Sequence, residues 1–145
     1  MTSKREQILS ALYTKVKALE SATVKVYRNL DKPQKVPTGG IIILRDGAAE
    51  EPEVLLSPLT YIFEHYVMLE AMVQNPDPAA RNTALDALLA NVGAVVSANR
   101  TLDGLAEWIE AKAPDFQEEP IEGAATLHTA TVQIMVRFFT FDPLN

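Results

Sequence analysis

The sequence predicts an α+β domain in which two main helices pack on one face of a mostly antiparallel sheet of about four to six strands. Two observations lead to this prediction. Residues 60–74 and 125–141 are long runs with a period of two, which is typical of strands with one buried face. Residues 3–19 and 78–98 carry apolar side chains at three- and four-residue steps, so they predict the helices that cover this face.

The first predicted helix begins at Ser3, because Ser3 and Glu6 have the spacing of a capping box. In such a box the serine accepts a hydrogen bond from the Glu6 amide, and the glutamate reaches back to the serine amide. One apolar stripe then faces the sheet, formed by Ile8, Leu9, Leu12, Val16 and Leu19.

Three short strands are expected before the long one, at residues 23–28, 41–44 and 53–57, mostly as antiparallel neighbours. The polar segment Asn29–Gly40, with its prolines and glycines, is either a surface loop or a contact loop for a partner. Residues 45–52 are predicted to form an acidic hairpin tip, in which Asp46-Gly47 is the turn pair.

In the second helix Asp77 suits the N-cap and Pro78 the first helical position. Gly93 costs roughly 1 kcal/mol relative to alanine, which close packing on the sheet would explain. Residues 105–113 fit either a helix or a strand, and we favour a strand because 115–123 is predicted to be a loop before the last long strand. The expected order is one helix, four strands, a second helix and two strands.

Composition limits the function classes. A length of 145 residues suits one domain spanning 1–145, and a net charge of −6 argues against nucleic-acid recognition. The absence of cysteine excludes disulfides and thiolate metal sites. No apolar run approaches the roughly 18 residues of a membrane span, and we expect neither a signal peptide nor a membrane partner.

No set of residues predicts catalysis. His65 and His128 lie on the apolar faces of the long strands and are interpreted as core histidines. If the two strands pair, the histidines could be neighbours, but without carboxylate or cysteine company they would make a poor metal site. The acidic residues 50–53 lack the pattern of a calcium loop. We therefore predict no enzyme activity, no cofactor and no bound metal.

The second faces of both long strands are unexpectedly apolar, and they need cover from loops and long side chains or from another subunit. Contact with another subunit is the favoured interpretation, because a sheet with free edges is suited to pairing with a neighbour. The residues concerned are Ile62, Tyr66, Met68, Met72, Leu127, Met135 and Phe139.

Several segments together resemble one class of phage protein. They are Arg5-Glu6-Gln7-Ile8-Leu9, Gly40-Ile41-Ile42-Ile43-Leu44-Arg45-Asp46-Gly47, Leu56-Ser57-Pro58-Leu59-Thr60-Tyr61, the helix opened by Asp77-Pro78 with Ala84-Leu85-Asp86-Ala87-Leu88-Leu89, and Arg100-Thr101-Leu102. The chain is similar in length and element order to the tail terminator, or tail completion, family of phages and prophages, whose lambda-type member is minor tail protein U.

The resemblance implies a structural subunit of the virion tail, assembled in the host bacterial cytoplasm. Such subunits form a hexameric ring that caps the tail tube, stops its polymerisation and offers a surface to the head–tail connector protein. The expected partners are further copies of the chain, the major tail tube protein and the connector. Candidate contact residues are Lys32, Gln34, Lys35, Arg45, Asp46, Glu50, Glu51, Tyr66, Met68, Met72, Met135 and Phe139.

Two alternatives stay open. One is a small ligand-binding or transferase-type enzyme domain with a pocket between helices and sheet that uses His65 or His128. The other is a different head–tail joining or tail-assembly component on a similar fold.

Overall fold

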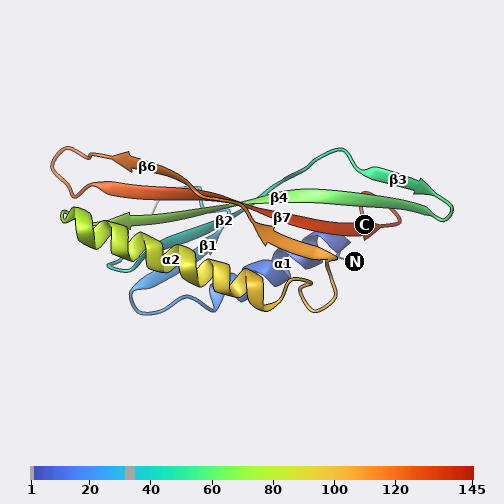
Figure 1. Cartoon of the computed structure of the whole chain (residues 1–145), viewed down its shortest axis with the longest axis horizontal. Helices are drawn as coiled ribbons and strands as arrows, with labels where there is room; N and C mark the ends of the chain where they lie inside the picture. Colours follow the sequence, from blue (N-terminus) through green and yellow to red (C-terminus); the bar gives the residue numbers. More distant parts are fainter. Residues whose placement is uncertain (1, 32–34) are drawn as a thin grey trace.

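The computed structural model describes residues 2–31 and 35–145. Two helices, α1 (Lys4–Lys17) and α2 (Pro78–Ala98), lie on the same side of one mixed sheet (Figure 1). The seven strands of this part of the chain are β1 (Val24–Arg28), β2 (Gly40–Ala49), β3 (Glu53–Leu56), β4 (Leu59–Gln74), β5 (Trp108–Ala111), β6 (Asp115–Glu119) and β7 (Leu127–Thr140). The predicted α+β class is confirmed, although the sheet has one strand more than the upper expected number.

The sheet is built around the antiparallel pair of β4 and β7. Their register runs from Tyr61 opposite Thr140 to Gln74 opposite Leu127. β2 and then β1 extend the sheet beyond β4, and β5 lies beyond β7. β3 and β6 pair with opposite ends of this long ribbon, β3 beside β4 and β6 beside β7. Figure 1 accordingly shows β3 at one end of the molecule and β6 at the other.

β1 and β2 are parallel, whereas the other strand pairs in the described part of the sheet are antiparallel. The sequence predicted antiparallel neighbours here, and that expectation is wrong for this pair. Two parallel neighbours require a connection of about a dozen residues that returns the chain to the same end. The long segment between Arg28 and Gly40 is this connection, which explains its length.

The main core lies between the helices and one face of the sheet. The alternation of β4 and β7 directs one set of side chains, including Phe63, Leu69 and Ile134, toward the helices. The helices contribute the predicted stripes, and both predicted helix starts are confirmed. Ser3 Oγ accepts a hydrogen bond from the Glu6 amide at 3.1 Å. The helical residues buried in this core are Ile8, Leu9, Leu12, Val16, Leu85, Leu88, Val92 and Val96.

The second half of the predicted capping box is wrong, because the Glu6 carboxylate accepts from Arg28 and Ser10 instead of reaching back to Ser3. The expectation for Gly93 is also wrong. A Cβ atom built at Gly93 has no heavy atom within 4 Å, so close packing does not explain this glycine.

Asp46 and Gly47 do not form a hairpin tip. β2 continues to Ala49, and its pairing with β4 shifts register between Arg45 and Ala48, which makes these two residues a β-bulge. Gly47 has φ of +67°, and a Cβ there would overlap the carbonyl oxygen of Tyr66. An Asp-Gly pair, which predicts a turn from sequence, therefore forms a bulge within a strand here.

The region after α2 differs from the prediction in one strand. A strand at residues 105–113 is confirmed for Trp108–Ala111, and it pairs with β7 as expected. The predicted loop at 115–123 is wrong, because Asp115–Glu119 forms β6 beside β7. All five residues of β6 are exposed, so backbone pairing stabilises this strand without the buried side chains that would reveal it in sequence.

Candidate interaction surfaces

The two histidines lie far apart along the central strand pair. His65 is opposite Val136 in the register, whereas His128 is opposite Val73 near the other end. The expectation that strand pairing would make them neighbours is therefore wrong. Both side chains are buried, as predicted for residues on the core face.

His65 packs against the β-bulge. Its Nε2 lies within hydrogen-bonding distance of the Asp46 carbonyl oxygen, so Nε2 carries the proton and donates. Its Nδ1 is buried and has no hydrogen-bond partner among the described residues. Burial lowers the pKa of His65 below its ordinary value, an effect that the Asp46 carbonyl partly offsets. A neutral imidazole that donates to a carbonyl suits a structural role in the core.

His128 belongs to a different cluster at the β6 end of the sheet. Its Nδ1 is 3.9 Å from Glu118 Oε1, and its ring centroid is 5.9 Å from that of Phe116. Arg81 is also buried here, and its Nη2 is 3.7 Å from the same carboxylate oxygen. Within residues 2–31 and 35–145, no group of three or more acidic, histidine or cysteine side chains is placed to hold a metal ion.

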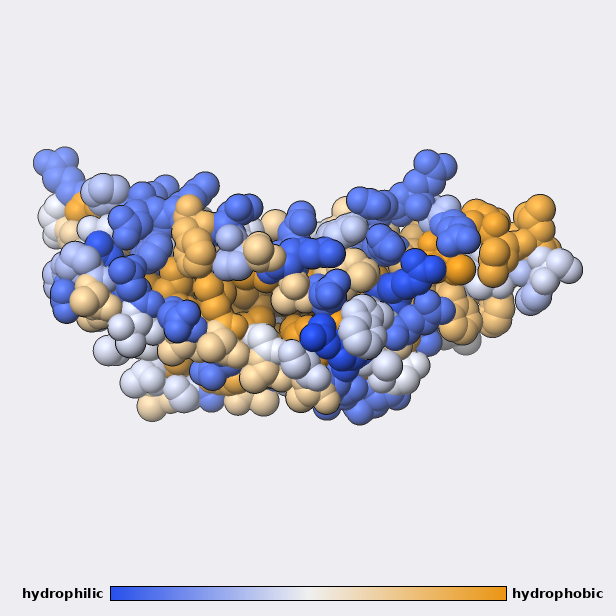
Figure 2. Space-filling view, in the orientation of Figure 1, coloured by the Kyte–Doolittle hydropathy of each residue, from blue (hydrophilic) through white to orange (hydrophobic). Residues whose placement is uncertain are grey.

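A groove opens beside this cluster, between α2 and β6, with a volume of about 360 Å³. Its walls are mostly apolar. The exposed ring of Phe116, 55% accessible, forms one side. Figure 2 shows hydrophobic side chains in the region between β6 and α2. We call this feature the α2–β6 groove, and its lining residues are Asn82, Leu85, Asp86, Leu89, Phe116 and His128.

Exposed apolar side chains gather at the opposite end of the molecule. The turn between β3 and β4 carries them beyond the helices, and the end of β7 lies alongside (Figure 1). Leu56 is 83% exposed and Phe141 is 65% exposed. Figure 2 shows this end as a group of orange side chains. We call it the apolar end, and its residues are Val54, Leu55, Leu56, Leu59, Phe139, Phe141 and Leu144.

The sheet face opposite the helices is only partly open. Met72 is 7% exposed because it packs against Ile41 and Ile43, so its side chain presents little surface for the predicted subunit contact. This small second core is covered by the chain itself. The half-buried side chains that cover it are Tyr27, Leu30, Val36 and Leu127.

The rest of that face mixes apolar and charged groups. Tyr66, Met68 and Met135 are half-buried, with Tyr66 opposite Met135 in the register. Arg137 lies among three carboxylates, 3.3 Å from Glu64 and 3.1 Å from Glu107. Its third partner is Glu53, at 3.8 Å. This face is therefore less apolar than the alternation of β4 and β7 suggested.

The other predicted contact residues divide into three groups. Lys32 and Gln34 lie outside the described residues. Lys35, Glu50, Glu51 and Phe139 are exposed. Arg45 and Asp46 are instead engaged within the chain.

Arg45 donates to Glu70 at 2.9 Å and to the Leu30 carbonyl oxygen at 2.9 Å. The Asp46 carboxylate accepts from Arg28 Nε at 2.9 Å. Both predicted contact residues therefore already have partners in their own subunit.

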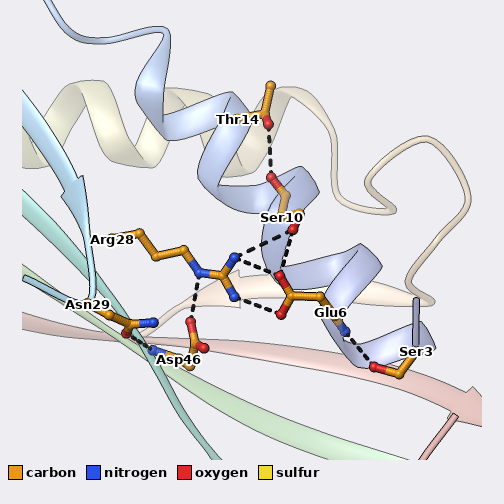
Figure 3. A network of polar contacts seen from close by, with 7 residues as sticks. All are labelled: Ser3, Glu6, Ser10, Thr14, Arg28, Asn29 and Asp46. Atoms are coloured by element: carbon orange, nitrogen blue, oxygen red, sulfur yellow. Dashed lines mark hydrogen bonds and ion pairs between the residues drawn. The ribbon is translucent and has the colours of Figure 1, made fainter. Parts of the chain in front are cut away.

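Figure 3 shows the polar network around Arg28, which joins α1, β1 and the bulge of β2. Arg28 donates to both carboxylate oxygens of Glu6, at 2.8 and 2.9 Å. These bonds lower the pKa of Glu6 from its ordinary 4.5 to about 2, and a bond from Ser10 adds to the effect. The same contacts raise the pKa of Arg28, so both side chains remain charged. The network fixes α1 on the sheet and is structural.

Sequence reasoning did not identify the two surfaces that the fold makes most prominent. The apolar end had a signal, because residues 54–59, between a predicted short strand and the long strand, contain no charged side chain and four apolar ones. The α2–β6 groove had none, because it depends on the pairing of β6 with β7.

Comparison with protein-family models finds no match for the chain, and comparison with curated proteins finds none either. Neither helix in the described part of the chain combines the length and apolar character that a membrane crossing needs. Function is therefore inferred from the fold, the surfaces and the resemblance described above.

Proposed function

We propose that the protein is a non-catalytic structural subunit that assembles with copies of itself, as a phage tail terminator does. The observation that carries this proposal is the apolar end. Single exposed leucines are common on protein surfaces, but a contiguous group of this kind is typical of an interaction site. The β3–β4 turn at its tip extends beyond the helices (Figure 1), and the leucines of this turn are exposed.

The sheet edges support the same function. β3 pairs with β4 along one side, and β6 pairs with β7 along one side, so each has an outer edge that can accept a neighbouring strand. All residues of both strands are exposed. A monomeric enzyme has little use for two exposed edges and an apolar extension, whereas a ring subunit can bury all three.

In this proposal the subunits form a hexameric ring in the virion tail, after assembly in the host cytoplasm. The ring caps the major tail tube protein and presents a surface to the head–tail connector protein. The predicted contacts Lys35, Glu50, Glu51 and Phe139 are exposed and available for these partners.

Two measurements test the proposal. Light scattering after size exclusion should give the mass of a hexamer, or of a monomer that assembles on tube ends. Polymerisation of the purified tail tube protein, followed by electron microscopy, should give shorter tubes when the protein is present. A protein that stays monomeric and leaves tube length unchanged would contradict the proposal.

The α2–β6 groove favours a second candidate function, a small ligand-binding domain that uses His128. In that case His128→Gln should abolish binding of the ligand, while His65→Gln, at the other end of the strand pair, serves as the matched control. The structural proposal instead predicts that neither substitution changes capping, apart from a cost in stability.

A further inference from the structure

We propose that the apolar hairpin tip of one copy, residues 54–59, inserts into the α2–β6 groove of a second copy. This inference rests on the proposed function and names the surfaces that would join its subunits. The hairpin tip and the α2–β6 groove lie at opposite ends of the long axis of the chain (Figure 1). One feature is an apolar projection and the other an apolar hollow.

The two surfaces agree in polarity. Residues 54–59 read Val-Leu-Leu-Ser-Pro-Leu and contain no charged group, so the tip can enter an apolar site without leaving a charge buried and unpaired. In the groove, the leucines of α2 and the Phe116 ring supply the apolar walls. The exposed side chains of Asn82 and Asp86 stand at its margin, where they can hydrogen-bond to the polar Ser57 at the turn.

The two surfaces also agree in size. A cavity of about 150 Å³ holds one benzene-sized group. The groove, at about 360 Å³, therefore has room for two apolar side chains of that order. Leu56 and Leu59, which face each other across the β3–β4 pair, supply two such side chains.

Because projection and hollow are different surfaces at opposite ends, copies arranged head to tail make a heterologous contact. Each copy then uses its tip on one neighbour and its groove on the other, which produces a closed ring or an open filament. An antiparallel two-fold dimer would instead place each tip in the other copy's groove, and the Ser57→Cys/Asn82→Cys double variant would then stop at a covalent dimer.

Cysteine crosslinking tests this pairing, because the natural chain contains no cysteine. The variants are Ser57→Cys at the tip and Asn82→Cys at the groove. An equal mixture of the two should form a disulfide-linked dimer on a non-reducing gel, and neither alone should do so. The double variant should form a ladder of covalent oligomers. Asn91→Cys is exposed on the side of α2 away from Asn82, so its mixture with Ser57→Cys should stay uncrosslinked.

Charge variants give an independent measurement. Leu56→Glu and Phe116→Glu should each reduce the mass in light scattering to that of a monomer, and an equal mixture should recover dimers through the one intact tip and the one intact groove. Ala94→Glu, on the exposed side of α2, should leave assembly unchanged. Circular dichroism establishes that the variants are folded, and the cysteine variants decide the outcome if Phe116→Glu is not.

The pairing is overturned if Ser57→Cys crosslinks alone, or if the mixture fails to crosslink both in solution and on tube ends. An oligomer of the expected mass without this crosslink would refute the pairing and leave the proposed function standing. A monomer that also fails to cap tubes would refute both.

Discussion

Arg28 holds the Glu6 carboxylate with two parallel hydrogen bonds, Nη1 to Oε1 at 2.8 Å and Nη2 to Oε2 at 2.9 Å. A bidentate pair of this kind has well-defined geometry and is stronger than a single contact between neutral groups. It links α1 to β1, and Arg28 Nε extends the link to Asp46 in the bulge of β2. One guanidinium therefore links α1 to both β1 and β2.

The Glu6–Arg28 pair predicts a specific sensitivity to acid. The folded pKa of Glu6 is about 2 and its ordinary value is 4.5. Its contribution to stability is therefore complete above about pH 4.5 and is lost as the pH falls toward 2. Because the Glu6 side chain is 44% exposed and solvent screens the pair, we expect Glu6→Gln to lower the free energy of unfolding by about 1 kcal/mol at pH 7.

Urea denaturation at pH 7 and near pH 2.5 measures this effect, and the cost of Glu6→Gln should shrink at the lower pH. Glu51→Gln, which removes an exposed carboxylate, is the control and should change stability little at either pH. An equal cost of Glu6→Gln at both pH values would show that charge is not the cause.

Gly47→Ala tests the bulge. At φ of +67° an alanine is strained, and its Cβ would overlap the Tyr66 carbonyl oxygen, so β2 must shift. A strained backbone position alone costs about 1–3 kcal/mol, and we expect a loss of free energy of unfolding in the upper part of this range. Urea denaturation measures the loss. A change below about 0.5 kcal/mol, the usual limit for surface substitutions, would mean that the bulge adapts.

Gly93→Ala is the counterpart of Gly47→Ala at a glycine where an added Cβ meets no neighbouring atom. Gly93 is in the interior of α2, and a Cβ there meets no atom within 4 Å. Alanine should stabilise the protein by up to about 1 kcal/mol, because it restricts the unfolded chain and favours the helix. Thermal denaturation should show a higher midpoint. A lower midpoint would indicate that this face of α2 packs against something in solution.

His65 predicts a loss of stability on mild acidification. Burial lowers its folded pKa below the ordinary 6.5, so below about pH 6.5 the unfolded chain binds a proton that the folded core resists. The stability of the protein should therefore fall between pH 7.5 and pH 5. His65→Gln removes this dependence, so the difference in urea midpoint between the protein and the variant should be larger at pH 7.5 than at pH 5. A constant difference would show that His65 does not titrate in this range.

Met72→Ala distinguishes a core residue from a subunit contact. Met72 is 7% exposed and packs on Ile41 and Ile43. Truncation should lower the free energy of unfolding by about 2–4 kcal/mol, as for other buried large side chains. The comparison is made at protein concentrations where light scattering gives a monomer mass. Met68→Ala, at a half-buried position of the same face, is the control and should cost less. Equal costs would argue that the second core does not form.

The sequence by itself determined both helices, the two long strands and the face that each strand buries. These features depend on short-range periodicity, and the stripe of Leu85, Leu88, Val92 and Val96 or the alternation of β4 can be read without knowing any partner. The capping residues Ser3 and Asp77 are local for the same reason, since each accepts from an amide two or three residues away.

Only the tertiary structure decided the features that depend on what lies across a strand. Whether Asp46-Gly47 forms a turn or a bulge depends on the β4 register, and whether 115–119 is a loop or a strand depends on the free edge of β7. The same pairings leave the apolar end uncovered and create the α2–β6 groove. Backbone hydrogen bonds between distant segments carry no side-chain pattern of their own, which is why these two surfaces emerge only from the folded chain.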